Sequence, residues 1–312
     1  MSDPTGDTSW HLLRSQYFRP LFFTQFLGAF NDNLFRTGLS LWIVFELADV
    51  NTNLLVNVAA GLFILPFFLL STAAGQIADK IDKAGLIRGV KLAEIGIMAG
   101  GAAAWLLGNA WMLFAILLAM GSQSAFFSPS KYSILPQHLD ETDLVGGNAL
   151  IETGTFLAIL LGTILGGIIA GSDVPWLLAP ALVLVAILGY LTSRGIPAAP
   201  PPVPALEINW NPLSQLRQML SFTHREHYSV LLSILGISWF WLMGSVYLTQ
   251  IPNYVANDLN GGSGVVTLLL ASFSIGIGLG AILCARLSGH KVEIGVVPFG
   301  ALGLSLFAVH LS

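Results

Sequence analysis

The sequence predicts an all-α membrane protein that crosses the bilayer many times, and three observations carry this prediction. Of the 312 residues, 54% are hydrophobic and only 10% are charged, whereas a soluble domain has about 25% charged residues. The mean hydropathy is +0.76, and apolar runs long enough to cross a bilayer recur along the chain. Glycine occurs 33 times, as expected where helices pack closely in a membrane.

Composition and motifs also exclude several classes of protein. The single cysteine, Cys284, cannot form an internal disulfide, and a net charge of −4 gives no basic surface for nucleic acid. The sequence has no HExxH motif, no P-loop and no paired cysteines. We therefore expect no nucleic-acid partner, no metal, no cofactor and no enzymatic activity in these residues.

Nine segments are apolar over about 20 residues, the length that crosses the hydrocarbon core of a membrane. They are 21–47, 54–74, 90–107, 110–128, 148–171, 175–193, 228–251, 264–285 and 292–311. All basic residues except Arg36 then lie on one side of the membrane: Arg14, Arg19, Lys80, Lys83, Arg88, Lys91, Lys131, Arg194, Arg217, Arg225, Arg286 and Lys291. The other side has Asp49, Asp173 and Asp258. Because Lys and Arg mark cytoplasmic loops, we expect a cytoplasmic N-terminus.

The loops predict two transmembrane parts and a linker. Residues 1–193 form a six-helix N-terminal bundle with short connections, and 228–312 form a partial C-terminal bundle of three helices, as in a fragment of a longer chain. The linker 194–227 begins with a proline-rich, extended stretch. Asn211 and Pro212 then predict a helix N-cap and first turn. Apolar residues at helical spacing follow, so this helix is expected to lie on the cytoplasmic membrane surface.

The first segment holds polar residues where they are costly. Asn31, Asp32 and Asn33 are followed by Arg36 near the middle of the apolar run, and ionisable groups inside spans usually face a cavity or each other. One interpretation is a midplane site for a zwitterionic or phosphate-bearing headgroup, with Asp32, Asn33 and Arg36 as ligands. The alternative is a structural ion pair, because Asp32 and Arg36 share a helical face.

Other polar residues extend these hypotheses. Glu152, with Asn148 one turn earlier, can line the same cavity, or Glu152 can pair with Lys131. Lys91 and Glu94 are expected to snorkel toward the interface or pair locally. Gly162 and Gly166 are spaced for a close helix crossing.

The connection between the second and third segments predicts a conformational latch. Gly75 permits close approach of helices, and Asp79 can cap a helix across the loop or pair with nearby cations. Such contacts can break and reform as two bundles move. We assign gating roles to Gly75, Asp79, Lys80, Lys83, Arg88 and Lys131.

These motifs resemble a known family. Gly75-x-x-x-Asp79-Lys80 within a 6 + 6 helix plan resembles the major facilitator superfamily. The stretches Gln25–Asn33, Ser128–Tyr132 and Asn148–Thr163 resemble bacterial lysophospholipid transporters. The stretches at 238–241, 248–254 and 286–295 are most similar to a fused form, in which acyltransferase and acyl-carrier-protein ligase domains follow the transporter.

The resemblance implies a major-facilitator-type bundle that moves lysophospholipid, chiefly lysophosphatidylethanolamine, from the outer to the inner leaflet of a bacterial inner membrane for re-acylation. Asp32 falls on the family's acidic position in the first helix. One departure is that 228–251 has no Lys or Arg, whereas some members carry an arginine there. Two alternatives stay open: a proton-coupled exporter of amphipathic compounds, and a non-transporting membrane module for attached acyltransferase domains.

Overall fold

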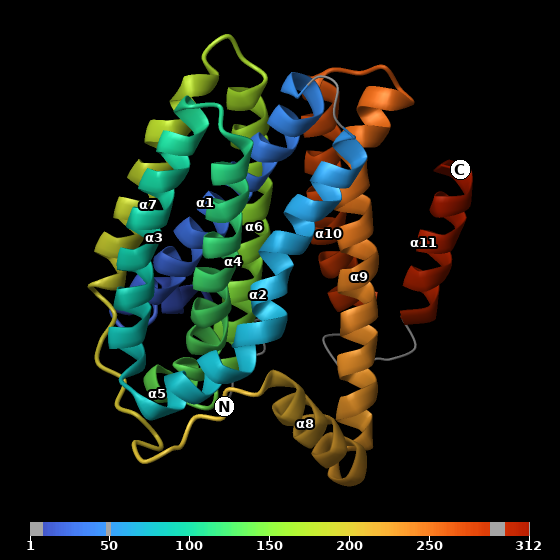
Figure 1. Cartoon of the computed structure of the whole chain (residues 1–312). Coiled ribbons are helices and arrows are strands. Elements are labelled where there is room, and N and C mark those ends of the chain that lie inside the picture. The colour runs from blue at the N-terminus through green and yellow to red at the C-terminus, as the bar shows by residue number, and fades with distance from the viewer. Residues whose placement is uncertain (1–8, 48–50, 288–296, 312) are drawn as a thin grey trace.

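The computed structural model describes residues 9–47, 51–287 and 297–311, and every regular element in these ranges is helical. The N-terminal bundle (Figure 1) contains η1 (Ser9–Arg14), α1 (Arg19–Glu46), α2 (Thr52–Lys80), α3 (Lys83–Leu106), α4 (Ala110–Ser133), α5 (Leu135–His138), α6 (Leu144–Ala170), η2 (Pro175–Leu177) and α7 (Leu178–Ser193). Beside it lie α8 (Pro212–Glu226), α9 (Tyr228–Asn257), α10 (Ser263–Leu287) and α11 (Val297–Leu311). The all-helical membrane architecture is thus confirmed.

Each of the nine predicted segments contains a helix, although some boundaries differ. Seven helices in the described residues are long and apolar enough by themselves to span a membrane. Neither α1, with its polar middle, nor the 15-residue α11 is among them. The second and third segments were predicted too short, because α2 continues to Lys80 and α3 already begins at Lys83. Asp49, Lys291 and the start of the ninth segment lie outside the described residues.

Short polar residues set the helix starts. The side chains of Asn51, Asp82, Asn109 and Asn211 accept backbone hydrogen bonds at the N-termini of α2, α3, α4 and α8. This satisfies amide groups that have no partner within the helix. Gly108 has a φ of +60° in the α3–α4 connection, a conformation that glycine adopts without the steric cost of a Cβ. The N-cap predicted at Asn211 is confirmed.

Glycines bring α1 and α6 into close contact. A Cβ atom at Gly162 would overlap the carbonyl oxygen of Phe30, and one at Gly166 would lie 2.8 Å from the carbonyl oxygen of Leu34. Both contacts are with the backbone of α1, which cannot move aside as a flexible side chain can. The close crossing predicted from the Gly162–Gly166 spacing is therefore confirmed, and α1 is held along its middle, where its polar residues lie.

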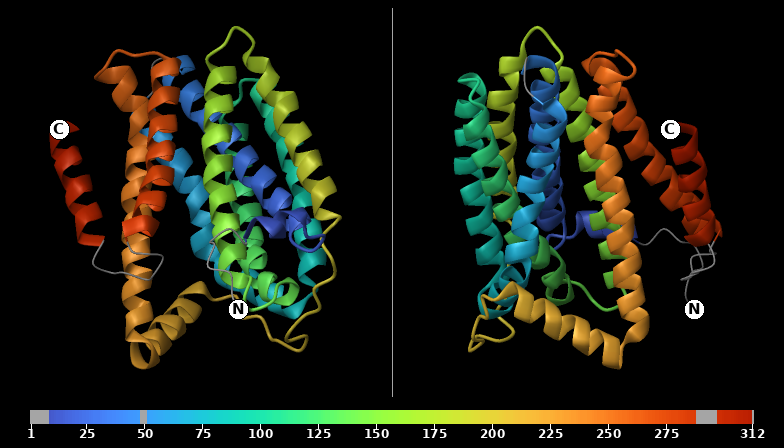
Figure 2. Two further views of the ribbon diagram at one scale, coloured as in Figure 1. Left: turned by 180° about the vertical axis from the view of Figure 1, so that it is seen from behind. Right: turned by 45° about the vertical axis from the view of Figure 1, so that its right-hand side comes forward.

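Of the helices after the linker, α9 and α10 pack against the N-terminal bundle. The buried residues of α9 are Pro252, Asn253 and Val255, all in its last two turns. Val255 packs with Leu41 of α1 and with α10 in one apolar cluster. Figure 2 shows α9 and α10 beside the bundle and α11 at the outer edge. The two parts thus meet beside the α9–α10 connection, whereas the first turns of α9 are exposed.

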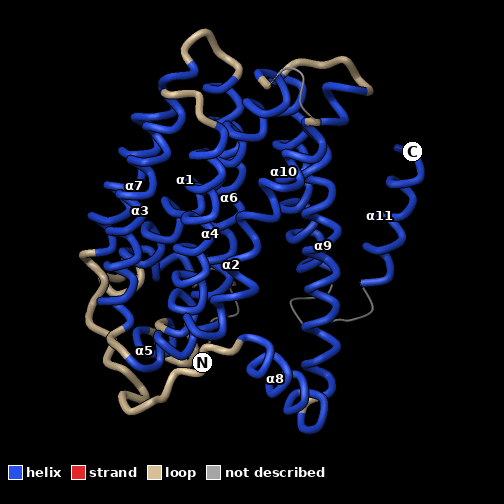
Figure 3. Tube along the Cα trace, viewed as in Figure 1, coloured by secondary structure: helices blue, strands red, loops and turns tan. Residues whose placement is uncertain are grey.

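The proline-rich linker is bound to the end of the bundle and follows it as a long loop (Figure 3). The backbone amide of Ala199 donates to Oδ2 of Asp82 at 2.7 Å, and the Ala199 carbonyl accepts from the amide of Lys83 at 3.1 Å. Farther along, Gln76 of α2 exchanges two hydrogen bonds with the backbone of Asn209. Hydrogen bonds therefore hold the linker, which leads to α8, against the end of α2 and the turn between α2 and α3.

Candidate functional site

The polar residues of α1 point toward different neighbours. Asn31 is fully buried and its Nδ2 donates to Oε1 of Glu94 in α3 at 3.3 Å and to the carbonyl oxygen of Leu182 in α7 at 3.2 Å. Asn33 donates to its own helix, at the carbonyl oxygen of Ala29. Asp32 is directed to α4 and Arg36 to α2. Polar residues close together in α1 therefore contact different helices, because successive helical residues are rotated by about 100°.

Lys91 and Glu94 form a buried ion pair next to α1. Nζ of Lys91 lies 2.6 Å from Oε2 of Glu94, with side-chain exposures of 1% and 2%. The ammonium group also lies 4.7 Å from the ring centre of Phe127. Gly28 of α1 leaves room for it, since a Cβ there would overlap Nζ. Local pairing was predicted correctly, but the alternative of snorkelling is wrong, because α3 begins earlier than expected and places both groups inside the bundle.

Asp32 and Arg36 are not an ion pair. Within the part of the chain that the structure describes, no ion pair at or below 4.0 Å joins them. Oδ2 of Asp32 accepts from Oγ of Ser124 at 2.9 Å, whereas its Oδ1 is buried with no hydrogen-bond partner among the described residues. The Arg36 guanidinium lies 4.5 Å from the ring centre of Phe63, a cation–π contact. The i, i+4 spacing permitted a pair, but the neighbouring helices offer each side chain a different partner.

A cavity of about 80 Å³ lies beside Arg36. Six helices line it: α1, α2, α4, α6, α9 and α10. Its polar lining residues are Asn33, Arg36, Thr37, Ser40, Thr163 and Thr249. Asn33 and Arg36, both predicted to bind a headgroup, therefore share a hollow between the two transmembrane parts, and Asp32 is one residue away on the same helix without lining it.

Glu152, Asn148 and Lys131 lie apart from this cavity and do not line it. Glu152 accepts a hydrogen bond from the Tyr132 hydroxyl of α4. Lys131 lies over the Tyr132 ring, 4.8 Å from its centre, and makes no ion pair with Glu152 among the described residues. Asn148 is exposed and donates to the carbonyl oxygen of Leu144 in its own helix.

The predicted latch residues lie at the α2–α3 turn, with altered roles. Gly75 is inside α2, and a Cβ there would meet no atom within 4 Å, so close helix approach is not its role. Asp82, not Asp79, caps α3, through its Oδ1 and the amide of Gly85 at 2.6 Å. Oδ1 of Asp79 lies 3.9 Å from the buried Nζ of Lys83.

The remaining latch residues lie on either side of this turn. Nη2 of Arg88 lies 3.7 Å from Oδ1 of Asp82. Lys80 is the last residue of α2. The cations around the turn are thus paired mainly by two aspartates, Asp79 and Asp82.

Sequence reasoning missed the polar residues of α4. Nε2 of Gln123 donates to Oε2 of Glu94 at 3.1 Å, and Ser124 contacts both Gln123 and Asp32. The signal available was a Gln-Ser pair inside an apolar segment, at 110–128. Its meaning depends on which helix lies opposite, which a single segment does not reveal.

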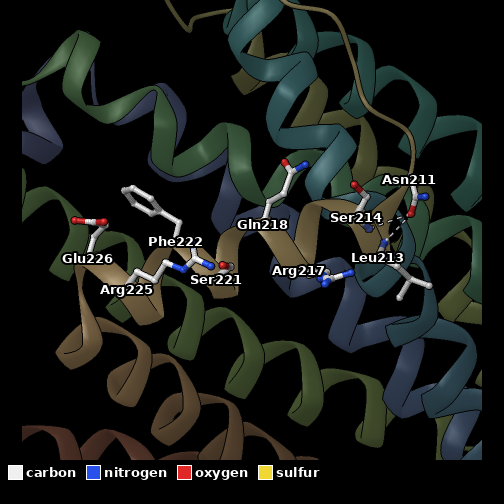
Figure 4. A pocket seen from close by; sticks show the side chains of 9 residues that line it. All are labelled: Asn211, Leu213, Ser214, Arg217, Gln218, Ser221, Phe222, Arg225 and Glu226. Atoms are coloured by element: carbon white, nitrogen blue, oxygen red, sulfur yellow. Dashed lines mark hydrogen bonds between the residues drawn. The ribbon is translucent and has the colours of Figure 1, made fainter.

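A second hollow, of about 740 Å³, lies open on α8 and is separate from this site (Figure 4). The residues lining it all lie between Asn211 and Glu226 and include Arg217 and Arg225. It is the surface of one helix and contains no buried charge. The smaller hollow beside Arg36 is the better candidate site, because it lies between the two transmembrane parts and next to charges inside the bundle.

The chain has recognisable relatives among known proteins. Residues 21–312 match the sequence profile of the Major Facilitator Superfamily. The lysophospholipid transporter LplT of Escherichia coli O1:K1 / APEC is 30% identical over 302 residues, which cover 93% of this chain and 71% of that protein. LplT of Serratia proteamaculans is 28% identical over 295 residues, covering 91% of this chain and 70% of that protein.

Proposed function

Because the chain belongs to the Major Facilitator Superfamily and, within it, to the family of the lysophospholipid transporters, we propose that it carries lysophospholipid across the bilayer by alternating access. It is a multi-pass protein of the bacterial inner membrane and a transporter rather than an enzyme. One observation carries the proposal. Asp32 and Arg36 of α1 each contact a different helix and not each other, and Arg36 lines a cavity between the two parts.

The charge balance inside the bundle supports a zwitterionic headgroup. Lys91 and Glu94 neutralise each other at 2.6 Å. Asp32 and Arg36 are one acidic and one basic side chain whose close contacts are with neutral groups, a serine hydroxyl and an aromatic ring. A lysophospholipid headgroup such as phosphoethanolamine carries the complementary charges. Arg36 suits the phosphate, since a guanidinium presents several donors in one plane, and Asp32 suits the ammonium.

The cavity supports a transport path that widens during the cycle. Its volume of about 80 Å³ is below the roughly 300–1,000 Å³ of ordinary ligand pockets. The headgroup therefore needs the parts at 1–193 and 228–312 to separate around the cavity, joined by the linker 194–227. The acyl chain stays against apolar helix faces or in lipid, where it loses no hydrophobic stabilisation.

The finer parts of the proposal follow from the family. We propose that the substrate is chiefly lysophosphatidylethanolamine, that it moves from the outer to the inner leaflet, and that it is then re-acylated. We place the N-terminus in the cytoplasm, because the basic loops mark that side. Glu152 and Asn148 are proposed to contact the headgroup at another stage of the cycle, and the charged residues of the α2–α3 turn, with Lys131, to act in gating.

The test is leaflet transfer of labelled lysophosphatidylethanolamine in proteoliposomes that contain the protein. The wild type is expected to accelerate transfer, while Asp32→Asn and Arg36→Ala each slow it at least tenfold. Arg225→Ala, on the exposed face of α8, is the control and should match the wild type. Unchanged transfer in both α1 variants would remove the headgroup site. Transfer only under an imposed pH gradient would favour a proton-coupled exporter, and no transfer by any form would favour a non-transporting module.

A further inference from the structure

We propose that Ser124 of α4 is a positioning residue for Asp32, and that Glu94 and Gln123 hold Ser124 in place. The inference rests on the proposed function, since it explains how the carboxylate is presented to the ammonium of the headgroup. It is carried by an unbroken chain of polar contacts, in which Glu94 binds Gln123, Gln123 contacts Ser124, and Ser124 donates to Asp32.

Glu94 is the fixed end of this chain. Its Oε2 accepts from Nζ of Lys91 at 2.6 Å and from Nε2 of Gln123 at 3.1 Å, and its Oε1 accepts from Nδ2 of Asn31 at 3.3 Å. The side chain is buried. Both carboxylate oxygens are therefore used, and three side chains from three helices restrict its rotation.

Gln123 contacts both Glu94 and Ser124 and so restricts the position of the Ser124 side chain. Because its amide nitrogen donates to Glu94, its Oε1 is turned the other way and lies 3.1 Å from Oγ of Ser124. A serine hydroxyl has one proton to donate, and Oγ lies between two acceptors, Oε1 of Gln123 and Oδ2 of Asp32. A carboxylate is a stronger acceptor than an amide oxygen, so the Ser124 proton goes to Oδ2 of Asp32.

The two carboxylate oxygens of Asp32 are therefore in different environments. Oδ2 is held by Ser124, and Oδ1 is buried and has no hydrogen-bond partner in the part of the chain that the structure describes. An unpaired oxygen of a buried carboxylate is unfavourable unless a donor meets it. With Oδ2 fixed, Oδ1 is left as the oxygen to which the ammonium of a lysophospholipid headgroup binds.

The test compares two lysophospholipids that differ in this cation, lysophosphatidylethanolamine and lysophosphatidylglycerol, in proteoliposomes with the full chain. Ser124→Ala is expected to raise KM for lysophosphatidylethanolamine about tenfold, the effect of losing one charge-assisted hydrogen bond. KM for lysophosphatidylglycerol, which has no ammonium, should stay within twofold. Ser124→Thr keeps the hydroxyl and should restore the wild-type ratio of the two KM values.

The matched control is Ser122→Ala, two residues away on α4, whose hydroxyl donates to the carbonyl oxygen of Leu118 in its own helix. It should leave both KM values unchanged. Equal losses for the two lipids in Ser124→Ala, or no loss for either, would overturn the positioning role while wild-type transfer still upholds the proposed function. A wild type that transfers neither lipid overturns the proposed function and this inference together.

Discussion

Nζ of Lys91 lies 2.6 Å from Oε2 of Glu94, and both side chains are buried inside the N-terminal bundle. The pair is neutral as a unit, and its two partners are one helical turn apart on α3. Asn31 and Gln123 complete the hydrogen bonding of the carboxylate. The pair therefore joins α1, α3 and α4 at the depth where α1 carries its own charges.

Glu94→Gln is expected to destabilise the protein strongly. The variant leaves the ammonium of Lys91 buried without an anion, which costs about 3 kcal/mol or more in the free energy of unfolding. The measurement is thermal unfolding in detergent, and the readout is the fraction of protein that stays monodisperse after heating. Combining Glu94→Gln with Lys91→Met removes both charges and should recover most of the lost stability. A double variant as unstable as the single one would contradict the account of an uncompensated charge.

Gly162→Ala is expected to weaken the contact between α1 and α6. The added methyl group would overlap the backbone carbonyl of Phe30, and such overpacking costs about 1–3 kcal/mol. Gly75→Ala is the matched control, because its methyl group meets no atom within 4 Å and alanine favours a helix by up to about 1 kcal/mol. The midpoint of thermal unfolding should fall for the first variant and stay or rise for the second. A lower midpoint for Gly75→Ala would contradict this expectation and would indicate that Gly75 packs closely against another helix, as its motif suggested.

His138 is expected to make stability depend on pH. Burial lowers the pKa of His138 below its usual 6.5, although the carbonyl of Ala198 and the charge of Asp82 act in the opposite direction. The unfolded chain then binds a proton more readily than the folded one, so stability rises with pH. The contribution is fully present above about pH 6.5, the unfolded value, and is lost as pH falls toward the lower pKa of the folded protein.

Thermal midpoints measured between pH 5 and pH 8 test this expectation. His138→Gln should flatten the slope below pH 6.5, whereas His224→Gln, at an exposed position on α8, should leave the slope as in the wild type. An unchanged slope in His138→Gln would assign the pH dependence to other groups.

The sequence alone was sufficient for the helices and their local signals. Each of the nine apolar runs contains a helix among the described residues. Asn211 marked the start of α8, and Gly162 and Gly166 marked a close crossing. These features depend on residues within a few turns of each other, so their physical cause is visible in a short stretch of chain. The end of α2 and the start of α3 were predicted wrongly. An apolar run does not include charged residues, yet Lys80 ends α2 and the buried Lys83 begins α3.

Only the tertiary structure decided which polar groups meet. Asn31 bonds to Glu94 across 63 residues, and Ser124 bonds to Asp32 across 92. The local spacing of Asp32 and Arg36 allowed an ion pair, yet each side chain found a different helix. Inside a membrane the energy of a charge depends mostly on its nearest partners. Those partners are set by how helices distant in sequence pack together, which no single segment encodes.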